Sequence, residues 1–258
     1  MDNSYFSKDL HISAMVQLSK LQTNINLYEL ARSLEINSNL LYIEYGSEIT
    51  KGFNPKIKPK KKLKKYFYNQ VTVHVYNEQK INHRINVKIF NNGRIQMTGI
   101  NNESQGTETI QILIGEFNRL SEYDKISIFD SDSEIISSGE IETVLINSDF
   151  DIHYMINREL LHRLIVDRGY FSSYEPCTYP GVNIKYYHHP LKNNFGICDC
   201  DTPCNGKGKD DTCKKITIAV FKSGKIIITG GRNKNNISVA HKFITEFIQE
   251  YEDQIQLK

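Results

Sequence analysis

The stretch "VFKSGKIIITGG", residues 220–231, decides the fold because the chain contains nearly the same stretch earlier. Residues 89–100 read "IFNNGRIQMTGI", 131 positions upstream. Each stretch runs from the apolar end of one strand through a glycine turn into a second strand that ends in Thr-Gly. Self-similarity at a fixed offset marks a repeated structural unit. The sequence therefore predicts a duplicated domain half.

The same offset relates one further pair of segments. Residues 27–34, "LYELARSL", and 158–165, "RELLHRLI", both carry apolar residues at helical spacing. A second helical pattern follows each glycine hairpin, at 110–117 and at 237–251. Each half thus reads as strand, helix, several strands and helix, which predicts an α+β fold.

Strand alternation separates the two sides of each hairpin. One side is apolar and suits a core under helices. In both copies a phenylalanine stands at the end of a strand, on the side away from the predicted core. These residues are Phe90 and Phe221. This side is either covered or simply exposed, which is common, or it binds a partner. The DNA minor groove is one such partner, because apolar wedges can enter its base steps and kink the duplex.

Composition and charge indicate which classes of protein and partner are compatible with this chain. The 258 residues include 32 basic and 30 acidic side chains, a net charge of +2. Residues 56–65 are strongly basic and residues 130–142 are acidic. The basic run is a phosphate anchor, a nuclear targeting signal or a solvated insertion, and we favour the anchor. Without a signal peptide or long apolar run, we expect a soluble intracellular protein without a membrane partner.

One more motif leads to a known family. "FSSYEPCTYPGV", residues 171–182, resembles F-S-S-Y-E-P-E-L-F-P-G-L, the second-repeat motif of the TATA-box-binding protein (TBP) family. The 220–231 hairpin resembles that family's I-F-x-S-G-K-x-V-L-T-G-A. The resemblance is strong over about 141–253 and weaker over about 12–120. Long insertions indicate a divergent member, of the type that large double-stranded DNA viruses encode.

The resemblance implies a saddle: a curved antiparallel sheet of about ten strands with helices on its convex face. The predicted parts are a first repeat at 1–125 with a basic insertion at 55–66, an acidic linker at 126–140, and a second repeat at 141–258 with a cysteine-rich insertion at 190–214.

The family inserts two phenylalanines per repeat into the minor groove. Phe90 and Phe221 match one of each pair, and Tyr179 matches the other in the second repeat. In the first repeat we choose Phe67, with Phe53 as the rival. The other DNA-facing residues that we expect are Thr98, Thr229, Ile227, Gln96 and Asn147 on the groove floor, and Arg94, Lys225 and Lys185 near phosphates.

The chain also departs from the family. Ala14 and Leu145 stand where the family has a central asparagine in each repeat. Asn147 lies on the same side of its strand as Leu145 and partly compensates, whereas Asp149 would repel phosphates. These changes question the preference for a standard TATA sequence but not DNA bending itself, which depends on wedges and deformability.

A partner surface is implied only in part. Glu175 matches a glutamate that contacts transcription factor IIB, but Cys177 and Thr178 replace the next two family residues. We therefore expect a transcription initiation factor that binds and bends A+T-rich promoter DNA and recruits a transcription factor IIB-like factor and RNA polymerase. It would act in the nucleus or a viral compartment, or be packaged in the virion. The alternatives are a protein-interaction scaffold that has lost DNA bending and a sequence-tolerant architectural DNA binder.

The remaining chemical signal is a cysteine cluster in the insertion. Four soft ligands within sixteen residues suit a tetrahedral zinc site, with His188 and His189 as spare ligands; the other interpretation is a loop of reduced or later oxidised thiols. DNA binding itself requires no cofactor, and no motif of an enzyme is present. The proposed metal ligands are Cys198, Cys200, Cys204 and Cys213.

Overall fold

The structure is a computed structural model. It describes residues 10–54, 65–76, 84–123, 126–129, 139–192, 195–202, 204–208 and 212–257. The basic run up to Lys64 and the acidic stretch 130–138 lie outside the described residues. The predictions made for these two segments therefore stay predictions.

The chain divides into two compact units. We call residues 15–144 the first-repeat unit, and residues 145–258 together with residues 1–14 the second-repeat unit. The described residues form eleven antiparallel strands, where about ten were expected, together with a few helices. The predicted α+β class is confirmed.

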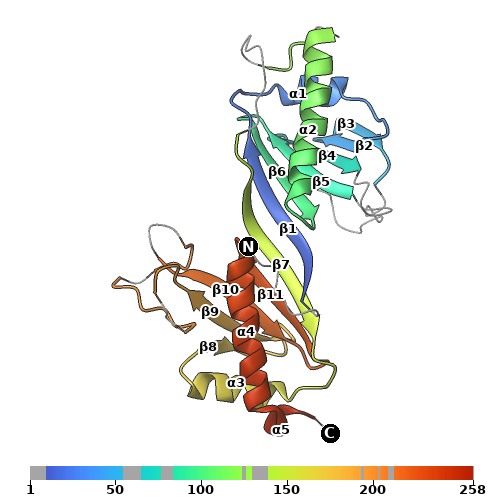
Figure 1. Cartoon of the computed structure of the whole chain (residues 1–258). Coiled ribbons are helices and arrows are strands. Elements are labelled where there is room, and N and C mark those ends of the chain that lie inside the picture. Colours follow the sequence, from blue (N-terminus) through green and yellow to red (C-terminus); the bar gives the residue numbers. More distant parts are fainter. Residues whose placement is uncertain are drawn as a thin grey trace. The chain divides into compact units, whose positions relative to one another are not determined.

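The first-repeat unit carries its strands in the order β3-β2-β4-β5-β6-β1. Figure 1 shows α2 lying across β4, β5 and β6 on one face of this sheet. The strands are β1 (His11–Lys20, from Met15 onward in this unit), β2 (Leu40–Tyr45), β3 (Ile49–Gly52), β4 (Gln70–Tyr76), β5 (Arg84–Phe90) and β6 (Arg94–Ile100). The helices are α1 (Leu27–Ser33), α2 (Ser104–Asn118) and the π-helical turn η1 (Arg119–Tyr123).

The second-repeat unit has the order β7-β11-β10-β9-β8. Here α4 lies across the sheet, in the same relation that α2 has to the other unit (Figure 1). The strands are β7 (Glu142–Asp151, from Leu145 onward in this unit), β8 (Phe171–Ser173), β9 (Val182–His188), β10 (Lys214–Val220) and β11 (Lys225–Gly231). The helices are α3 (Arg158–Asp167), α4 (Lys234–Glu250) and α5 (Glu252–Ile255).

Equivalent asparagines start the first helix of each unit. The Asn26 carboxamide oxygen accepts a hydrogen bond from the Glu29 amide at 3.2 Å, and that of Asn157 accepts one from the Leu160 amide at 3.1 Å. Asparagine is a favoured N-cap because its side chain satisfies an amide that has no partner within the helix. The repeat thus preserves a folding signal as well as the apolar pattern.

In each unit, the long helix packs against one face of the sheet, and the residues on that face are buried. In β6, Ile95 and Met97 are buried, and in β11 Ile226 and Ile228 are fully buried. From the helices, α2 contributes Ile110, Leu113 and Phe117 to this core, and α4 contributes Ile237, Ala240, Ile244, Phe247 and Ile248. The opposite side of each sheet, which we call the outer face, carries the alternate residues. Among the described residues, no helix is both long and apolar enough to cross a membrane.

Candidate nucleic-acid interface

The outer face of the second-repeat unit is built from two rows of residues that lie opposite one another on neighbouring strands. The polar row and the mixed row lie two residues apart along each strand, because alternate residues share a face. The polar row is Lys185, Thr217, Thr229 and Asn147, and the mixed row is Asn183, Ala219, Ile227 and Asp149.

The members of these rows on β7 and β11 line an open hollow of about 700 Å³. Ile227 supplies an exposed aliphatic side chain at 38% relative accessibility, an unusual exposure for isoleucine in a sheet. The hollow is lined by Ser13, Ala14, Asn147, Asp149, Phe221, Ser223, Lys225, Ile227 and Thr229. All of them belong to the second-repeat unit, so the hollow is a feature of that unit alone.

Phe221 lines this hollow, and the ring of Tyr179 contacts it. The Tyr179 and Phe221 ring centroids are 5.8 Å apart, with an interplanar angle of 63°. This edge-to-face arrangement is a favourable geometry for aromatic pairs. Gly181 provides the space for it, since a Cβ there would lie 2.9 Å from Tyr179 Cε1 and 3.2 Å from Phe221 Cε1.

A tight turn places Phe221 where strand β10 ends. The Phe221 amide donates to the Lys225 carbonyl at 2.9 Å, and the Gly224 amide donates to the Phe221 carbonyl at 3.1 Å. Gly224 has φ +87°, and an added Cβ would lie 2.3 Å from the Tyr154 carbonyl oxygen. The turn therefore requires glycine at this position.

The first-repeat unit repeats this turn. Gly93 has φ +76°, and its amide donates to the Phe90 carbonyl at 3.0 Å. Phe90 ends β5 half-buried, as Phe221 is half-buried after β10. Next to Phe90, the outer face of this unit carries Gln96 and Thr98 half-buried and Arg94 exposed. The strand parity predicted from the sequence is thus present in both units.

For the second wedge candidate of the first repeat, the described residues show no ring pair equivalent to Tyr179–Phe221. Phe67 is 58% exposed and Phe53 is 70% exposed. Within the described residues, the ring contacts of this unit involve neither of them, in contrast to the Tyr179–Phe221 pair. The choice of Phe67 over Phe53 stays a prediction.

The cationic side chains of the outer face differ in environment. Lys225 and Arg94 are exposed. Lys185 is half-buried, and its Nζ donates to Thr217 Oγ1 at 2.9 Å. Burial, together with the positive charge of Lys215, lowers the pKa of Lys185 below the ordinary lysine value. Lys225 is therefore the better placed of the two lysines to meet a phosphate.

The polar residues of β7 are already engaged. Thr229 Oγ1 donates to the Asn147 carboxamide oxygen, which leaves the Asn147 NH₂ group as a donor. Asp149 accepts from Ser13 Oγ at 2.6 Å. Both side chains are partly exposed and line the hollow.

The residue matched to the partner surface lies in the turn that holds Tyr179. The Thr178 and Tyr179 amides both donate to the Glu175 carbonyl at 2.9 Å, while Glu175 itself is exposed. One turn thus carries both a wedge candidate and a partner-binding candidate.

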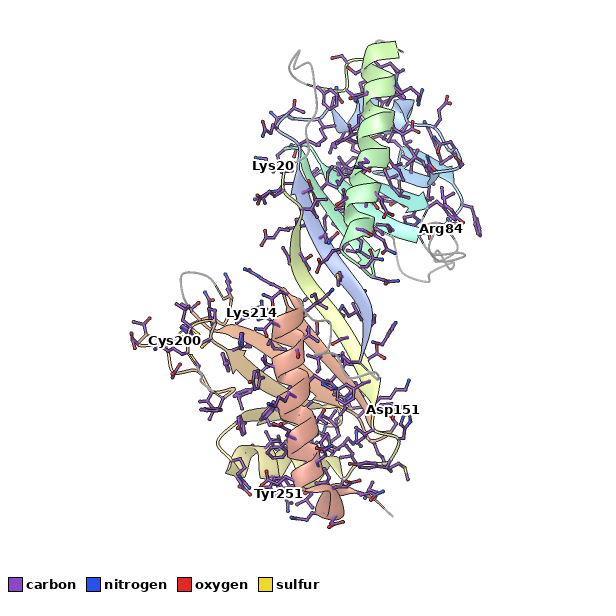
Figure 2. The ribbon with its side chains drawn as sticks, in the orientation of Figure 1. Lys20, Arg84, Asp151, Cys200, Lys214 and Tyr251 are labelled. Carbon is purple, nitrogen blue, oxygen red and sulfur yellow. The ribbon has the colours of Figure 1, made fainter. Side chains whose placement is uncertain are left out.

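The four cysteines of the insertion come together. Their sulfur atoms lie within 4.8 Å of one another. Cys198 and Cys204 sulfurs are 3.3 Å apart, and those of Cys200 and Cys213 are 3.4 Å apart. Figure 2 labels Cys200 in this loop and Lys214 at the start of β10, directly after Cys213. The arrangement is one that can bind a metal ion.

The two spare histidines are not part of this cluster. His188 Nδ1 lies 3.2 Å from the Asn236 side-chain nitrogen, and His189 Nδ1 accepts from the Leu191 amide at 3.1 Å. Burial and the neighbouring His189 lower the pKa of His188. Among the described residues, the group that can hold a metal consists of four cysteine sulfurs.

Comparison with known proteins agrees with this architecture. The family model described as "Transcription factor TFIID (or TATA-binding protein, TBP)" matches residues 146–251. A "TATA-box-binding protein-like" protein of Acanthamoeba polyphaga mimivirus is 30% identical over 271 residues, which cover 96% of this chain and 67% of that protein. The chain belongs to the TATA-box-binding protein family. The sequence-based identification of a divergent, viral-type TBP-like protein is confirmed.

A solved TBP structure supports the fold. Methanococcus jannaschii TBP aligns with a TM-score of 0.55 over 94% of this chain and 99% of its own, at 20% sequence identity. The expected TBP-like fold is therefore confirmed. Membership of the TBP family implies a DNA-binding role connected with transcription.

Three features of the TBP-like outer face were missed from the sequence. Gly181 makes room for the ring pair, and Ser13 holds Asp149. Phe171, 59% exposed, lies opposite Lys185 on edge strand β8 and so shares its face. Gly181 belongs to the motif at residues 171–182, so the sequence did point to it. The Ser13–Asp149 hydrogen bond joins residues 136 positions apart, and neither segment alone predicts it.

Proposed function

We propose that this TBP-family protein binds the minor groove of A+T-rich promoter DNA, bends it, and presents the bent DNA to initiation factors and RNA polymerase. The observation that supports this most is the Tyr179–Phe221 ring pair, of which Phe221 lines an outer-face hollow of about 700 Å³. Rings at this position can enter a base step, and the floor residues Ile227 and Thr229 suit the shallow groove behind it. The work is binding rather than catalysis.

A bend assay tests the proposal. Fluorescence resonance energy transfer between the ends of an A+T-rich duplex reports bending by the wild type and by a Phe90→Ala/Phe221→Ala variant. We expect the double variant to lose most of the bend, because unstacking needs the rings. Phe195→Ala is the control. Phe195 is an exposed phenylalanine, at 69% accessibility, and the adjacent Gly196 lies against Tyr186, a residue on the helix-covered side of the sheet. A wild type that neither bends nor saturably binds the duplex at low salt contradicts the proposal.

Two alternatives predict different results in the same assay. Asp149 in the hollow favours a protein-interaction scaffold, because a carboxylate near phosphates weakens DNA binding. That scaffold would bind a transcription factor IIB-like partner and leave the duplex straight. A sequence-tolerant architectural binder would bend A+T-rich and G+C-rich duplexes with similar affinity, so competition between them separates it from promoter selection.

For partner recruitment we propose Glu175 as a contact for the transcription factor IIB-like factor. Its carbonyl orders the turn through Thr178 and Tyr179 while its carboxylate remains exposed. A Glu175→Arg variant should retain DNA binding but lose the ternary complex in a gel-shift assay. Glu159→Arg, an exposed glutamate on α3, serves as the control for charge reversal. Such a protein would work where the DNA is transcribed, in the nucleus or in a viral compartment.

We also propose that the cysteine cluster holds a structural Zn²⁺. Tetrahedral ligands at the usual Zn–S length of about 2.3 Å are about 3.8 Å apart, between the closest sulfur pair at 3.3 Å and the 4.8 Å limit. Such an ion would tie the loop to the start of β10. Elemental analysis should find about one zinc per wild-type chain and none in Cys198→Ser/Cys204→Ser. Cys177→Ser, outside the cluster, should keep it; a metal-free wild type would favour reduced thiols.

A further inference from the structure

The two repeats differ at equivalent positions of the outer face. Asn147 lies opposite Thr229 in the second-repeat unit, and Val16 lies opposite Thr98 in the first. At the next outer position, two residues along β7, Asp149 lies opposite Ile227; its counterpart 131 positions upstream is Leu18. At these two positions, the first-repeat strand β1 carries aliphatic side chains where the second-repeat strand β7 carries hydrogen-bonding ones.

Asp149 is held in place from one side. Its Oδ1 atom accepts from Ser13 Oγ at 2.6 Å and lies 3.5 Å from His11 Nδ1. Within the described part of the chain, its hydrogen bonds all use Oδ1. The side chain is 44% exposed and lines the hollow beside Ile227. Oδ2 is therefore available to a donor that enters the hollow.

The minor groove offers such a donor at one kind of base pair only. A·T and T·A pairs present only acceptors there, whereas a G·C pair adds the guanine 2-amino group. An ionised carboxylate accepts hydrogen bonds and cannot donate them. Opposite A·T, the Oδ2 atom of Asp149 would be desolvated without a donor, which is unfavourable. Opposite guanine it would accept from the amino group.

Asn147 does not make the same distinction. Its carboxamide oxygen is engaged by Thr229, so it presents its NH₂ group, which can donate to the acceptors of either kind of pair. In the first repeat, Val16 and Leu18 have no hydrogen-bonding side-chain atoms. Gln96, which lies opposite Leu18, has a carboxamide that both donates and accepts, so it does not single out guanine. Among these outer-face residues, Asp149 carries the acceptor-only side chain.

We propose that Asp149 selects a G·C pair in the half of the site that the second repeat contacts, while the first repeat, with Leu18 at the equivalent position, makes no such selection. This rests on the proposed minor-groove binding. The target would be asymmetric: A+T-rich at one end, with one guanine amino group read at the other. Such a site sets the direction in which a pseudo-symmetric protein lies on DNA.

The test is competition among A+T-rich duplexes that each carry one G·C pair at a different position. We expect wild type to prefer one position, in one half only, by about tenfold over the all-A·T duplex. Inosine·C at that position lacks only the 2-amino group and should abolish the preference. This comparison needs no protein variant, so it stands even if a substitution at Asp149 disturbs folding.

Two variants locate the selecting group. Asp149→Leu, which copies the first repeat, should abolish the preference and retain binding of the all-A·T duplex. Leu18→Asp should create a second preferred G·C position in the other half. Glu159→Leu removes the same charge from exposed α3 and should change neither.

The results of these binding experiments distinguish failure of the Asp149 proposal from failure of minor-groove binding itself. Saturable binding in which every G·C pair weakens affinity, equally for wild type and Asp149→Leu, overturns the inference alone. Failure of wild type to bind any duplex overturns both. A preference that survives the inosine replacement also overturns the inference, because the amino group would not be the group selected.

Discussion

The ring of Tyr179 meets the ring of Phe221 edge to face, with 5.8 Å between their centroids, and a Cβ at Gly181 would contact both rings. The two rings come from different segments: one from the turn after β8, the other from the end of β10. Their contact means that neither wedge candidate can be displaced without affecting the other. The proposed wedge therefore depends on Gly181, which leaves the space for the two rings to meet.

Gly181→Ala should reduce DNA bending with little loss of stability. The new Cβ would lie 2.9 Å from the Tyr179 ring and push it away, but these are exposed side-chain atoms that can move. We expect the free energy of unfolding to change by less than about 1 kcal/mol, while the bend measured by energy transfer decreases. Gly115→Ala is the control, since nothing lies within 4 Å of its Cβ position on helix α2. Unchanged bending in Gly181→Ala would argue against the wedge role.

Gly224→Ala should destabilise the second-repeat unit. The residue has φ +87°, and its Cβ would lie 2.3 Å from a backbone oxygen of Tyr154. The left-handed backbone alone costs about 1–2 kcal/mol for a non-glycine residue, and the clash adds to this. Urea unfolding followed by circular dichroism measures the loss, with Gly115→Ala expected to be neutral or stabilising. If Gly224→Ala were as stable as wild type, the turn geometry described here would be incorrect.

Lys225→Ala should weaken DNA binding in a salt-dependent manner. Lys225 is exposed at the rim of the hollow, where it can neutralise one phosphate. Losing one such contact should reduce the slope of log affinity against log salt by about 1. Fluorescence anisotropy titrations at several salt concentrations measure the slope. Lys242→Ala, exposed on α4, should leave it unchanged; equal slopes for the two variants would exclude Lys225 from the phosphate contacts.

Lys185 should contribute a pH dependence to stability. Burial lowers its pKa in the folded protein, so the unfolded chain holds the lysine proton to higher pH than the folded chain does. Stability rises with pH wherever the unfolded state binds more protons. As pH rises through the folded pKa toward the ordinary lysine value, the Lys185 contribution should become more favourable.

The experiment compares wild type with Lys185→Met. Urea unfolding at about pH 7 and about pH 10 spans the alkaline window that concerns a lysine. The stability of wild type relative to the variant should improve at the higher pH. Lys242→Met is the exposed control, and its difference from wild type should not follow this trend. A decrease at the higher pH would contradict the assigned direction of the shift.

Much of the fold could be predicted from local patterns. The glycine hairpins, the capping asparagines Asn26 and Asn157, and the alternation around Ile226 and Ile228 are all properties of short segments. Their backbone preferences do not depend on distant partners. The family resemblance then supplied the connectivity, which no periodicity could have supplied.

The site was predicted less completely. Phe90 and Phe221 were expected on the outer face because strand parity fixes the side on which a residue lies. The contact of Tyr179 with Phe221, the Ser13–Asp149 hydrogen bond and the hollow they border join segments that are distant in sequence. Pairing between distant segments depends on the register of the whole sheet.

By itself, the sequence determined that the chain is duplicated and that each half contains strands and helices. It also determined that in each half a strand ends at a phenylalanine, just before a glycine turn. These follow from backbone conformational limits and from the burial of apolar side chains. Only the tertiary structure decided that four cysteine sulfurs converge, that Asn147 is engaged by Thr229, and that Asp149 is held by Ser13 in a hollow. Hydrogen bonds and metal-ligand geometry depend on atoms within about 3 Å of each other, and such proximity is set by packing across the whole unit.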